Sequence, residues 1–182
     1  MSKVVNHGTI DFNCKDIIKQ VAKSTRMVAG FDRSNSEYGD DNYWKRITKL
    51  YDQTVRNDHF IHEDGWDSFI PDTFFSTTGI KKDPTEIVVF QVLPGKFTPP
   101  HKDKFTGFLT NNPVDRKVIT KFWIPLTKPS LGHALFFPNE VVYNVKEGTI
   151  IELPKDELHS ACNAGTEMRL IMTITGVREN GK

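Results

Sequence analysis

The sequence predicts a mainly β protein with N-terminal helices, because strand-like runs, turn residues and one doubly buried strand follow each other along the chain. Short runs rich in Val, Ile, Phe and Thr recur at nearly regular spacing between residues 86 and 177. Gly, Pro and Asn residues fall between the runs, where tight turns are expected. About eight such strands match a jelly roll, also called a double-stranded β-helix, the cupin-like fold of two packed antiparallel sheets.

The predicted strands run from an apolar stretch before Pro94-Gly95 to the last apolar stretch of the chain. They cover residues 87–93, 97–103, 118–126, 134–137, 141–145, 149–153, 158–163 and 168–175. In the last strand, Arg169 and Thr173 alternate with apolar residues, and residues 170–172 are apolar in succession. We therefore predict that this strand is buried on both faces and is not an exposed edge strand.

Residues 1–85 are predicted to form a helical and irregular scaffold that packs on the sheet. Asp16–Val28 places Ile17, Ile18 and Val21 at helical spacing, and Tyr43–Val55 repeats the pattern. We expect these two helices to flank the outside of the sheet.

Two other N-terminal segments, Asp32–Asp41 and Asp58–Thr78, are rich in Asp, Ser, Gly and aromatic residues and are predicted to be irregular. Nothing in the sequence indicates a second domain. Residues 1–182 are therefore interpreted as a single domain with its double-stranded β-helix core at 86–177.

Length and charge exclude several classes of partner. The chain has 182 residues and a formal net charge of +1, so no nucleic acid and no membrane partner is expected. No apolar run approaches the roughly 18 residues of a membrane span, and Met1–Asp11 shows no signal-peptide core. We expect an intracellular, cytoplasmic and soluble protein. Cys14 and Cys162 are too few for a disulfide framework.

The strongest functional signal is a group of three metal-ligand residue types at defined spacing. His101 and Asp103 are two residues apart, so they point the same way on a strand. His159 comes from a distant strand and completes a set of two imidazoles and one carboxylate. On a six-coordinate iron such a facial set leaves three positions open. Each histidine alone is more often a structural residue, so the joint spacing carries the prediction.

An arginine follows the last of these histidines. Arg169 lies ten residues after His159, about the length needed to complete a strand, turn and return antiparallel beside it. A guanidinium there can hold the far end of a dicarboxylate that chelates the metal. Since a buried arginine without an anion is unfavourable, the sequence predicts an anionic ligand at this position.

The C-terminal half of the chain resembles the Fe(II)- and 2-oxoglutarate-dependent oxygenases of the jelly-roll type. The resemblance rests on Gln91–Gly95 leading to His101-Lys102-Asp103, on Trp123–Leu126, and on Glu147–Thr149 running through His159 to Met168-Arg169-Leu170. The His-x-x-x-Asn pattern of His159–Asn163 resembles the aspartyl/asparaginyl β-hydroxylases, some of which lack the carboxylate that Asp103 supplies here. Prolyl-hydroxylase-like and phage-encoded oxygenases are equally similar.

The resemblance implies a ligand set and a reaction. His101, Asp103 and His159 would hold Fe(II), while 2-oxoglutarate chelates the iron and Arg169 pairs with its C5 carboxylate. O2 takes the remaining position, and decarboxylation of 2-oxoglutarate to succinate and CO2 is coupled to hydroxylation of a small molecule or of an amino-acid side chain. Thr173 is a candidate hydroxyl donor to the C5 carboxylate, and Lys121 is a second candidate cation.

A basic stretch adjoins the predicted metal ligands. Residues 96–121 include six lysine and arginine residues but only two acidic residues, Asp103 and Asp115. An anionic substrate, or a peptide with acidic neighbours, is expected there, although lysines at strand edges explain the same pattern. The loop Phe105–Arg116 is predicted to be a lid over the substrate. The sequence does not define an oligomeric state.

Two other interpretations remain open at this level. Gly148, Pro154, His159 and Asn163 have the spacing of the second cupin motif, with Asp156 where glycine is usual. A cupin-type metal-dependent enzyme, or a sugar-binding domain of that fold, is thus an alternative. That motif pair expects His-x-His and a nearby glutamate, whereas the next downstream glutamate here is Glu140. The other alternative is a non-enzymatic jelly-roll binding module.

Overall fold

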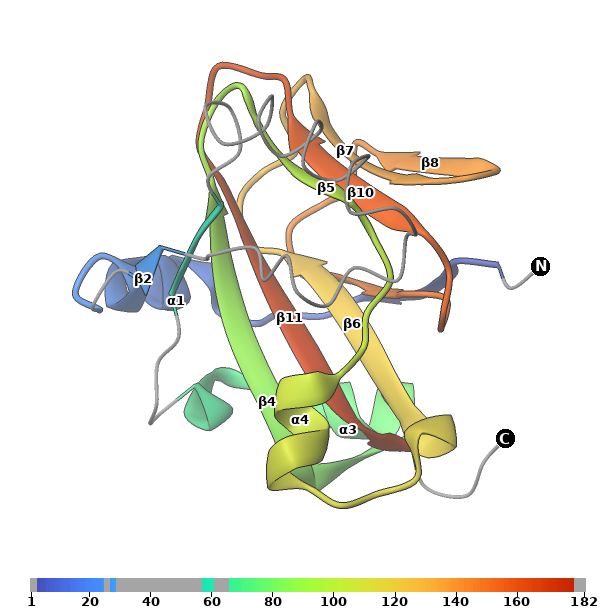
Figure 1. The fold of residues 1–182 in the computed structure, drawn as a ribbon. Coiled ribbons are helices and arrows are strands. Elements are labelled where there is room, and N and C mark those ends of the chain that lie inside the picture. Colours follow the sequence, from blue (N-terminus) through green and yellow to red (C-terminus); the bar gives the residue numbers. More distant parts are fainter. Residues whose placement is uncertain (1–2, 25–26, 29–56, 61–65, 179–182) are drawn as a thin grey trace.

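A computed structural model describes residues 3–24, 27–28, 57–60 and 66–178, and in these ranges two antiparallel sheets dominate (Figure 1). The larger sheet contains, in spatial order, β1 (Val5–Thr9), β9 (Thr149–Glu152), β6 (Ile119–Pro125), β11 (Arg169–Arg178), β4 (Ile80–Val92), β3 (Asn57–Phe60) and β2 (Met27–Val28). The smaller sheet contains β5 (Lys96–His101), β10 (His159–Asn163), β7 (His133–Phe137) and β8 (Glu140–Tyr143). The predicted mainly β, double-stranded β-helix fold is confirmed.

Helices are few and short. The α-helices are α1 (Cys14–Val21), α3 (Asp72–Thr78) and α4 (Thr106–Asn111), and the 3₁₀-helices are η2 (Asp67–Phe69) and η3 (Arg116–Val118). Among the residues that the structure describes, no helix has the length and apolar character needed to cross a membrane.

β11 lies in the middle of the larger sheet, between β6 and β4. Every residue from Arg169 to Val177 is buried, which confirms the predicted burial on both faces. Thr173 lies opposite Trp123 of β6 and opposite Val88 of β4. An edge strand with a solvent-facing arginine is therefore excluded.

A hydrophobic cluster fills the interior between the two sheets. Its buried members come from both sheets and are Val92, Trp123, Leu135, Phe137, Ile151, Leu153 and Ile171. Strand alternation puts Arg169 and Thr173 on the same face of β11 as Ile171. The interior therefore combines an apolar wall with these two polar side chains.

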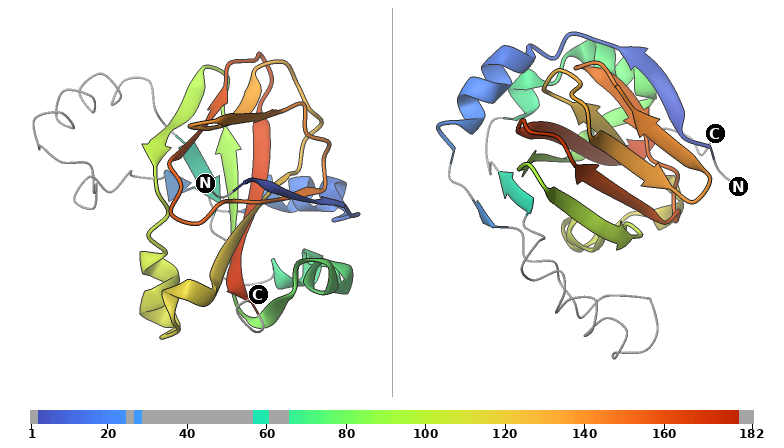
Figure 2. Two further views of the ribbon diagram at one scale, coloured as in Figure 1. Left: turned by 90° about the vertical axis from the view of Figure 1, so that its right-hand side faces the viewer. Right: turned by 90° about the horizontal axis from the view of Figure 1, so that it is seen from above.

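Two helices lie on the opposite face of the larger sheet (Figure 2). Ile17 of α1 and Phe74 of α3 are fully buried in one cluster with Leu170 and Met172 of β11. Because these β11 residues alternate with the interior-facing ones, the strand joins both hydrophobic layers. The predicted helical cover of the sheet is confirmed for α1.

The first predicted helix is shorter than expected. α1 ends at Val21, whose carbonyl accepts hydrogen bonds from the Ser24 hydroxyl at 2.8 Å and from the Ser24 amide at 3.2 Å. Met27 and Val28 belong to β2, so their assignment to a helix was wrong. The predicted helix Tyr43–Val55 and the irregular segment Asp32–Asp41 lie outside the described residues.

Further elements before residue 80 were not predicted. The segment 58–78 was expected to be irregular, but it contains α3 and most of β3. α3 follows Pro71 and stops at Gly79, whose φ of 70° suits glycine, so its start and stop signals were present in the sequence. β1 is an edge strand with mostly exposed residues, which explains why no apolar alternation marks it. That residues 1–182 form a single domain stays a prediction.

Candidate metal centre

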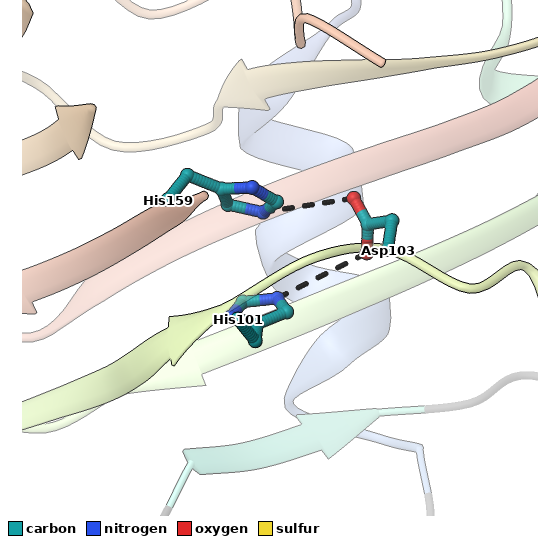
Figure 3. A group of neighbouring side chains, drawn as sticks. All are labelled: His101, Asp103 and His159. Carbon is teal, nitrogen blue, oxygen red and sulfur yellow. Dashed lines mark ion pairs between the residues drawn. The ribbon is translucent and has the colours of Figure 1, made fainter. Parts of the chain in front are cut away.

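The pairing of β5 with β10 brings the three predicted ligands together (Figure 3). His101 is the last residue of β5 and lies opposite His159, the first residue of β10. Asp103 lies just beyond β5 and not on the strand as predicted, and its carboxylate turns toward both imidazoles. Residues distant in sequence thus meet at one end of the smaller sheet.

The distances within this group suit a single metal ion. The Asp103 carboxylate lies 3.9 Å from His101 Nε2 and 3.6 Å from His159 Nε2. The two imidazole centroids are 4.3 Å apart, and one donor atom from each residue lies within 4.8 Å of the others. Ligand atoms placed about 2.1 Å from one metal ion are roughly 3 to 4 Å apart, so only small adjustments are needed.

The protein holds Asp103 in its ionised form. Burial would raise the pKa of this carboxyl, but the ammonium of Lys121, together with the neighbouring His159 and His101, lowers it to about 2. The Lys121 ammonium donates a hydrogen bond to Asp103 Oδ1 at 2.7 Å. An anionic ligand is therefore present throughout the physiological pH range.

His159 is oriented as a metal ligand by its own loop. Its Nδ1 lies 3.1 Å from the Glu157 carbonyl, which can only accept, so Nδ1 carries the proton and Nε2 keeps its lone pair toward Asp103. Burial lowers the pKa of His159, although Asp103 opposes this effect. A neutral imidazole with a fixed tautomer results, which is the form that binds metals.

Glu86 is a neighbour of this group that sequence reasoning missed. It lies on β4 opposite Thr175, which in turn lies opposite Lys121. Burial raises the pKa of Glu86, while Lys121 lowers it and Asp103 raises it further. Only the strand register reveals this proximity, because no spacing motif links Glu86 with Asp103.

Arg169 begins β11 and is only 2% exposed. Its Nη1 donates hydrogen bonds to the carbonyls of Cys162 at 2.8 Å and Ala134 at 3.1 Å, and the guanidinium lies 4.7 Å from the Trp123 ring centroid. No acidic side chain among the described residues pairs with it. Burial lowers the pKa of Arg169 to about 10. A buried cation of this kind is unfavourable unless an anion joins it.

The predicted site residues divide into two neighbouring groups. Thr173 is buried and lies opposite Trp123, so it shares the Arg169 side of the interior. Lys121, which was predicted to support the same carboxylate as Arg169, instead contacts Asp103. Lys121 and Trp123 are alternate residues of β6, about 7 Å apart on one face. The metal-ligand group and the Arg169 site therefore adjoin along this strand.

Fold and site together define the class of protein: a double-stranded β-helix with a His-x-Asp and a distant His at one end of its interior. No protein-family model matches the sequence, and no curated protein matches it. Solved structures of similar fold were found at 11% to 16% sequence identity, a level that shows the fold alone.

Three of these structures show which kinds of protein have a similar fold. AviO1 from Streptomyces viridochromogenes is 13% identical with a TM-score of 0.53, and the match covers 98% of this chain and 91% of that one. The viral collagen prolyl hydroxylase from Paramecium Bursaria Chlorella virus-1, in its 2OG complex, is 15% identical with a TM-score of 0.49, over 98% and 96%. A Cupin 2 conserved barrel domain protein from Salinispora arenicola is 16% identical with a TM-score of 0.39, over 81% and 86%.

Proposed function

We propose that this protein is an Fe(II)- and 2-oxoglutarate-dependent dioxygenase that acts as a hydroxylase. Such an enzyme couples the decarboxylation of 2-oxoglutarate to succinate and CO2, with O2, to oxidation of a second substrate. The observation that carries the proposal is Arg169, a buried cation without an acidic partner among the described residues. It lies in the same interior as a group of two histidines and one carboxylate.

The donor chemistry of the three ligand residues fits Fe(II). Two imidazoles and one ionised carboxylate form the facial set typical of non-haem Fe(II) oxygenases. His101, Asp103 and His159 would hold the iron, and contacts from Lys121 and from the Glu157 carbonyl would keep two of these ligands in orientation. When bound, the iron and 2-oxoglutarate supply the oxygen activation that oxidises the substrate.

Arg169 is suited to bind the C5 carboxylate of 2-oxoglutarate. Among the described residues, only its Nη1 has hydrogen-bond partners, which leaves Nε and Nη2 for the two oxygens of a carboxylate. The carbonyls on Nη1 and the Trp123 ring hold the guanidinium in place. The Nε1 of Trp123 is buried without a partner among the residues that the structure describes, and it is a further donor available to an oxyanion.

The apolar wall between the sheets has a separate function. Val92, Leu135 and Ile171 line the interior beside Arg169 and Thr173, and all three are nearly inaccessible to solvent. Water is excluded from this space, which strengthens the pairing of Arg169 with a carboxylate. Thr173 is proposed to donate its hydroxyl to the same carboxylate.

The ligand geometry does not favour cupin-type ligation. The glutamate that such ligation requires would be Glu140, but this residue is exposed on β8. It borders a surface groove together with Asn6 and Tyr143 and is not a member of the ligand group.

The substrate is proposed to be an anionic small molecule or a peptide with acidic neighbours. Lys102 and Lys104 flank Asp103 directly in sequence and are both partly exposed, so positive charge borders the metal-ligand group. Succinate formation stimulated by acidic peptides, and not by basic peptides of equal length, is the expected result of a substrate screen. Equal stimulation of succinate formation by acidic and by basic peptides would contradict the proposed preference for acidic substrates.

The visible spectrum of the anaerobic protein with Fe(II), before and after addition of 2-oxoglutarate, tests the proposed function. A metal-to-ligand charge-transfer band is expected in the wild-type protein and is expected to need much more 2-oxoglutarate in Arg169→Ala. Bound iron without such a band would contradict the assignment of 2-oxoglutarate as cosubstrate, and a protein that binds no iron would contradict the assignment as an oxygenase.

A further inference from the structure

The side chain of Arg116 connects the two segments that carry Asp103 and His159. We propose that Arg116 and Asp156 form a clasp that positions these two metal ligands relative to each other. The proposal rests on the proposed function only in taking the His101, Asp103 and His159 group as a metal site.

One arm of the clasp reaches Asp103. The Arg116 Nη2 donates a hydrogen bond to the backbone carbonyl of Asp103 at 3.1 Å, and its guanidinium lies 5.9 Å from the Phe105 ring centroid. These contacts close the base of the predicted lid, Phe105–Arg116, which carries α4. Phe108 of α4 is buried with Ile119, so the far part of this predicted lid is anchored as well.

The other arm reaches His159 through a turn. Arg116 also pairs with the carboxylate of Asp156, and the Lys155 ammonium donates to the Arg116 carbonyl. The turn closes with a hydrogen bond from the Glu157 amide to the Pro154 carbonyl. The carbonyl of Glu157, at the end of this turn, accepts a hydrogen bond from the Nδ1 of His159. The position of Asp156 therefore determines where the partner of the His159 ring lies.

The backbone at Asp156 indicates that its side chain has a specific use. Asp156 has a φ of 58°, a left-handed conformation that glycine adopts without strain and that other residues adopt at a cost. Asp156 is therefore the less favourable residue for the backbone, and the pairing with Arg116 is what its side chain adds.

Stability alone does not explain the clasp. The side chains of Arg116 and Asp156 are 41% and 53% exposed, and exposed ion pairs contribute little to folding. Groups that orient metal ligands have a larger effect on metal affinity, typically 10- to 100-fold. Metal affinity, rather than unfolding temperature, is therefore the quantity that Arg116 and Asp156 are expected to control.

The test compares Arg116→Ala and Asp156→Gly with Arg178→Ala in the full-length protein. Arg178 is a matched control because it too pairs with a carboxylate, that of Glu152 at 2.7 Å, and has a buried Nε without a partner. Co(II) titration without 2-oxoglutarate gives the metal affinity, and thermal unfolding of the metal-free protein gives stability. The first two variants are expected to bind Co(II) about tenfold more weakly than wild type, and the control is expected to bind it as wild type does.

Asp156→Gly separates positioning from folding, because glycine relieves the left-handed strain. Its unfolding temperature is expected to equal or exceed that of wild type while its Co(II) affinity falls. Wild-type Co(II) affinity in Arg116→Ala and Asp156→Gly would overturn the proposal. So would a loss of affinity that Arg178→Ala shows equally.

A readout without metal keeps this test independent of the proposed function. The ¹⁵N NMR shifts of the metal-free protein report which nitrogen of His159 carries the proton. The Nδ1-protonated form is expected in wild type and a mixture of tautomers in Arg116→Ala; identical tautomers in both would overturn the clasp. A wild-type protein that binds Co(II) and shows this tautomer change, but gives no charge-transfer band with Fe(II) and 2-oxoglutarate, would contradict only the proposed function.

Discussion

The metal-ligand group and the Arg169 site share one interior, but only the first has its charges balanced by the protein. Asp103 is surrounded by Lys121 and two imidazoles, and its pKa is lowered to about 2. Arg169 has carbonyls and an aromatic ring around it, and its pKa is lowered to about 10 by burial. The metal-ligand group therefore suits a metal cation, whereas the Arg169 site lacks an acidic partner among the described residues and suits an anionic ligand.

The largest effect is expected from Asp103→Asn, which removes the only anionic ligand of the metal-ligand group while keeping the side-chain volume. Metal affinity is expected to fall more than about 100-fold, since two neutral imidazoles remain. Anaerobic titration with Fe(II) measures this change. Asp115→Asn is the control, because Asp115 lies in the same loop and its carboxylate, within the described part of the chain, accepts a hydrogen bond only from the Lys117 amide. Equal affinities in the two variants would remove Asp103 from the ligand set.

What the sequence could predict about the site depends on local patterns in the chain, and what it could not predict depends on contacts between distant segments. His101, Asp103, His159 and Arg169 could be proposed as site residues because residue type and spacing are local properties of the chain. Two of the structural expectations were wrong: Asp103 lies beyond the end of β5, and β10 and β11 belong to different sheets, so Arg169 does not return antiparallel beside His159. The contact of Lys121 with Asp103 could not be predicted, because it depends on how far one sheet is shifted against the other. β1 was missed for a related reason: as an exposed edge strand it has no apolar pattern of its own and is defined by its pairing with β9.

The next largest effect is expected from Arg169→Met, which replaces the buried cation by an apolar side chain of similar length. The affinity for 2-oxoglutarate is expected to fall about 100-fold, because a carboxylate loses its bidentate partner, while Fe(II) affinity stays unchanged. The unfolding temperature is expected to be maintained, since a buried charge without a counterion is removed. Calorimetric titration of the Fe(II) protein and thermal unfolding of the apoprotein measure the two quantities.

This variant is the sharpest test of the contrast between the two regions. Strong destabilisation of Arg169→Met with unchanged 2-oxoglutarate affinity would mean that the guanidinium serves the fold through the carbonyls of Ala134 and Cys162. Lys121→Met is the matched comparison, because it removes a cation that does have an acidic partner. Destabilisation is expected there and not at Arg169.

Lys121→Met also predicts a change in acid stability. The pKa of Asp103 lies below its ordinary value of 3.8, so ionised Asp103 stabilises the fold above that pH, and this stability is lost as pH falls toward about 2. The shift corresponds to about 2 kcal/mol. Without Lys121, burial of the carboxyl is no longer offset, so the variant is expected to lose up to this amount at neutral pH. Its acid unfolding is expected to begin at a higher pH than in wild type.

Denaturant unfolding of the apoprotein between pH 2 and pH 7 measures both effects. Lys117→Met removes an exposed lysine near the same loop and is expected to leave the curve unchanged. If the two variants have the same pH dependence, the ammonium of Lys121 does not balance the charge of Asp103, and the contrast with Arg169 is lost.

The smallest effect is expected from Thr173→Val, which removes one hydroxyl from the Arg169 side of the interior and keeps the side-chain shape. A single hydrogen bond to a charged carboxylate contributes about 1.5 kcal/mol, so the dissociation constant of 2-oxoglutarate is expected to rise about tenfold. Thr175→Val is the matched control, because Thr175 lies on the same face of β11 but opposite Lys121. A tenfold change in the control and none in Thr173→Val would place the C5 carboxylate nearer the metal-ligand group. The five-carbon cosubstrate would then not extend along β6 from Asp103 to Arg169, and Arg169 would have to bind a different anion.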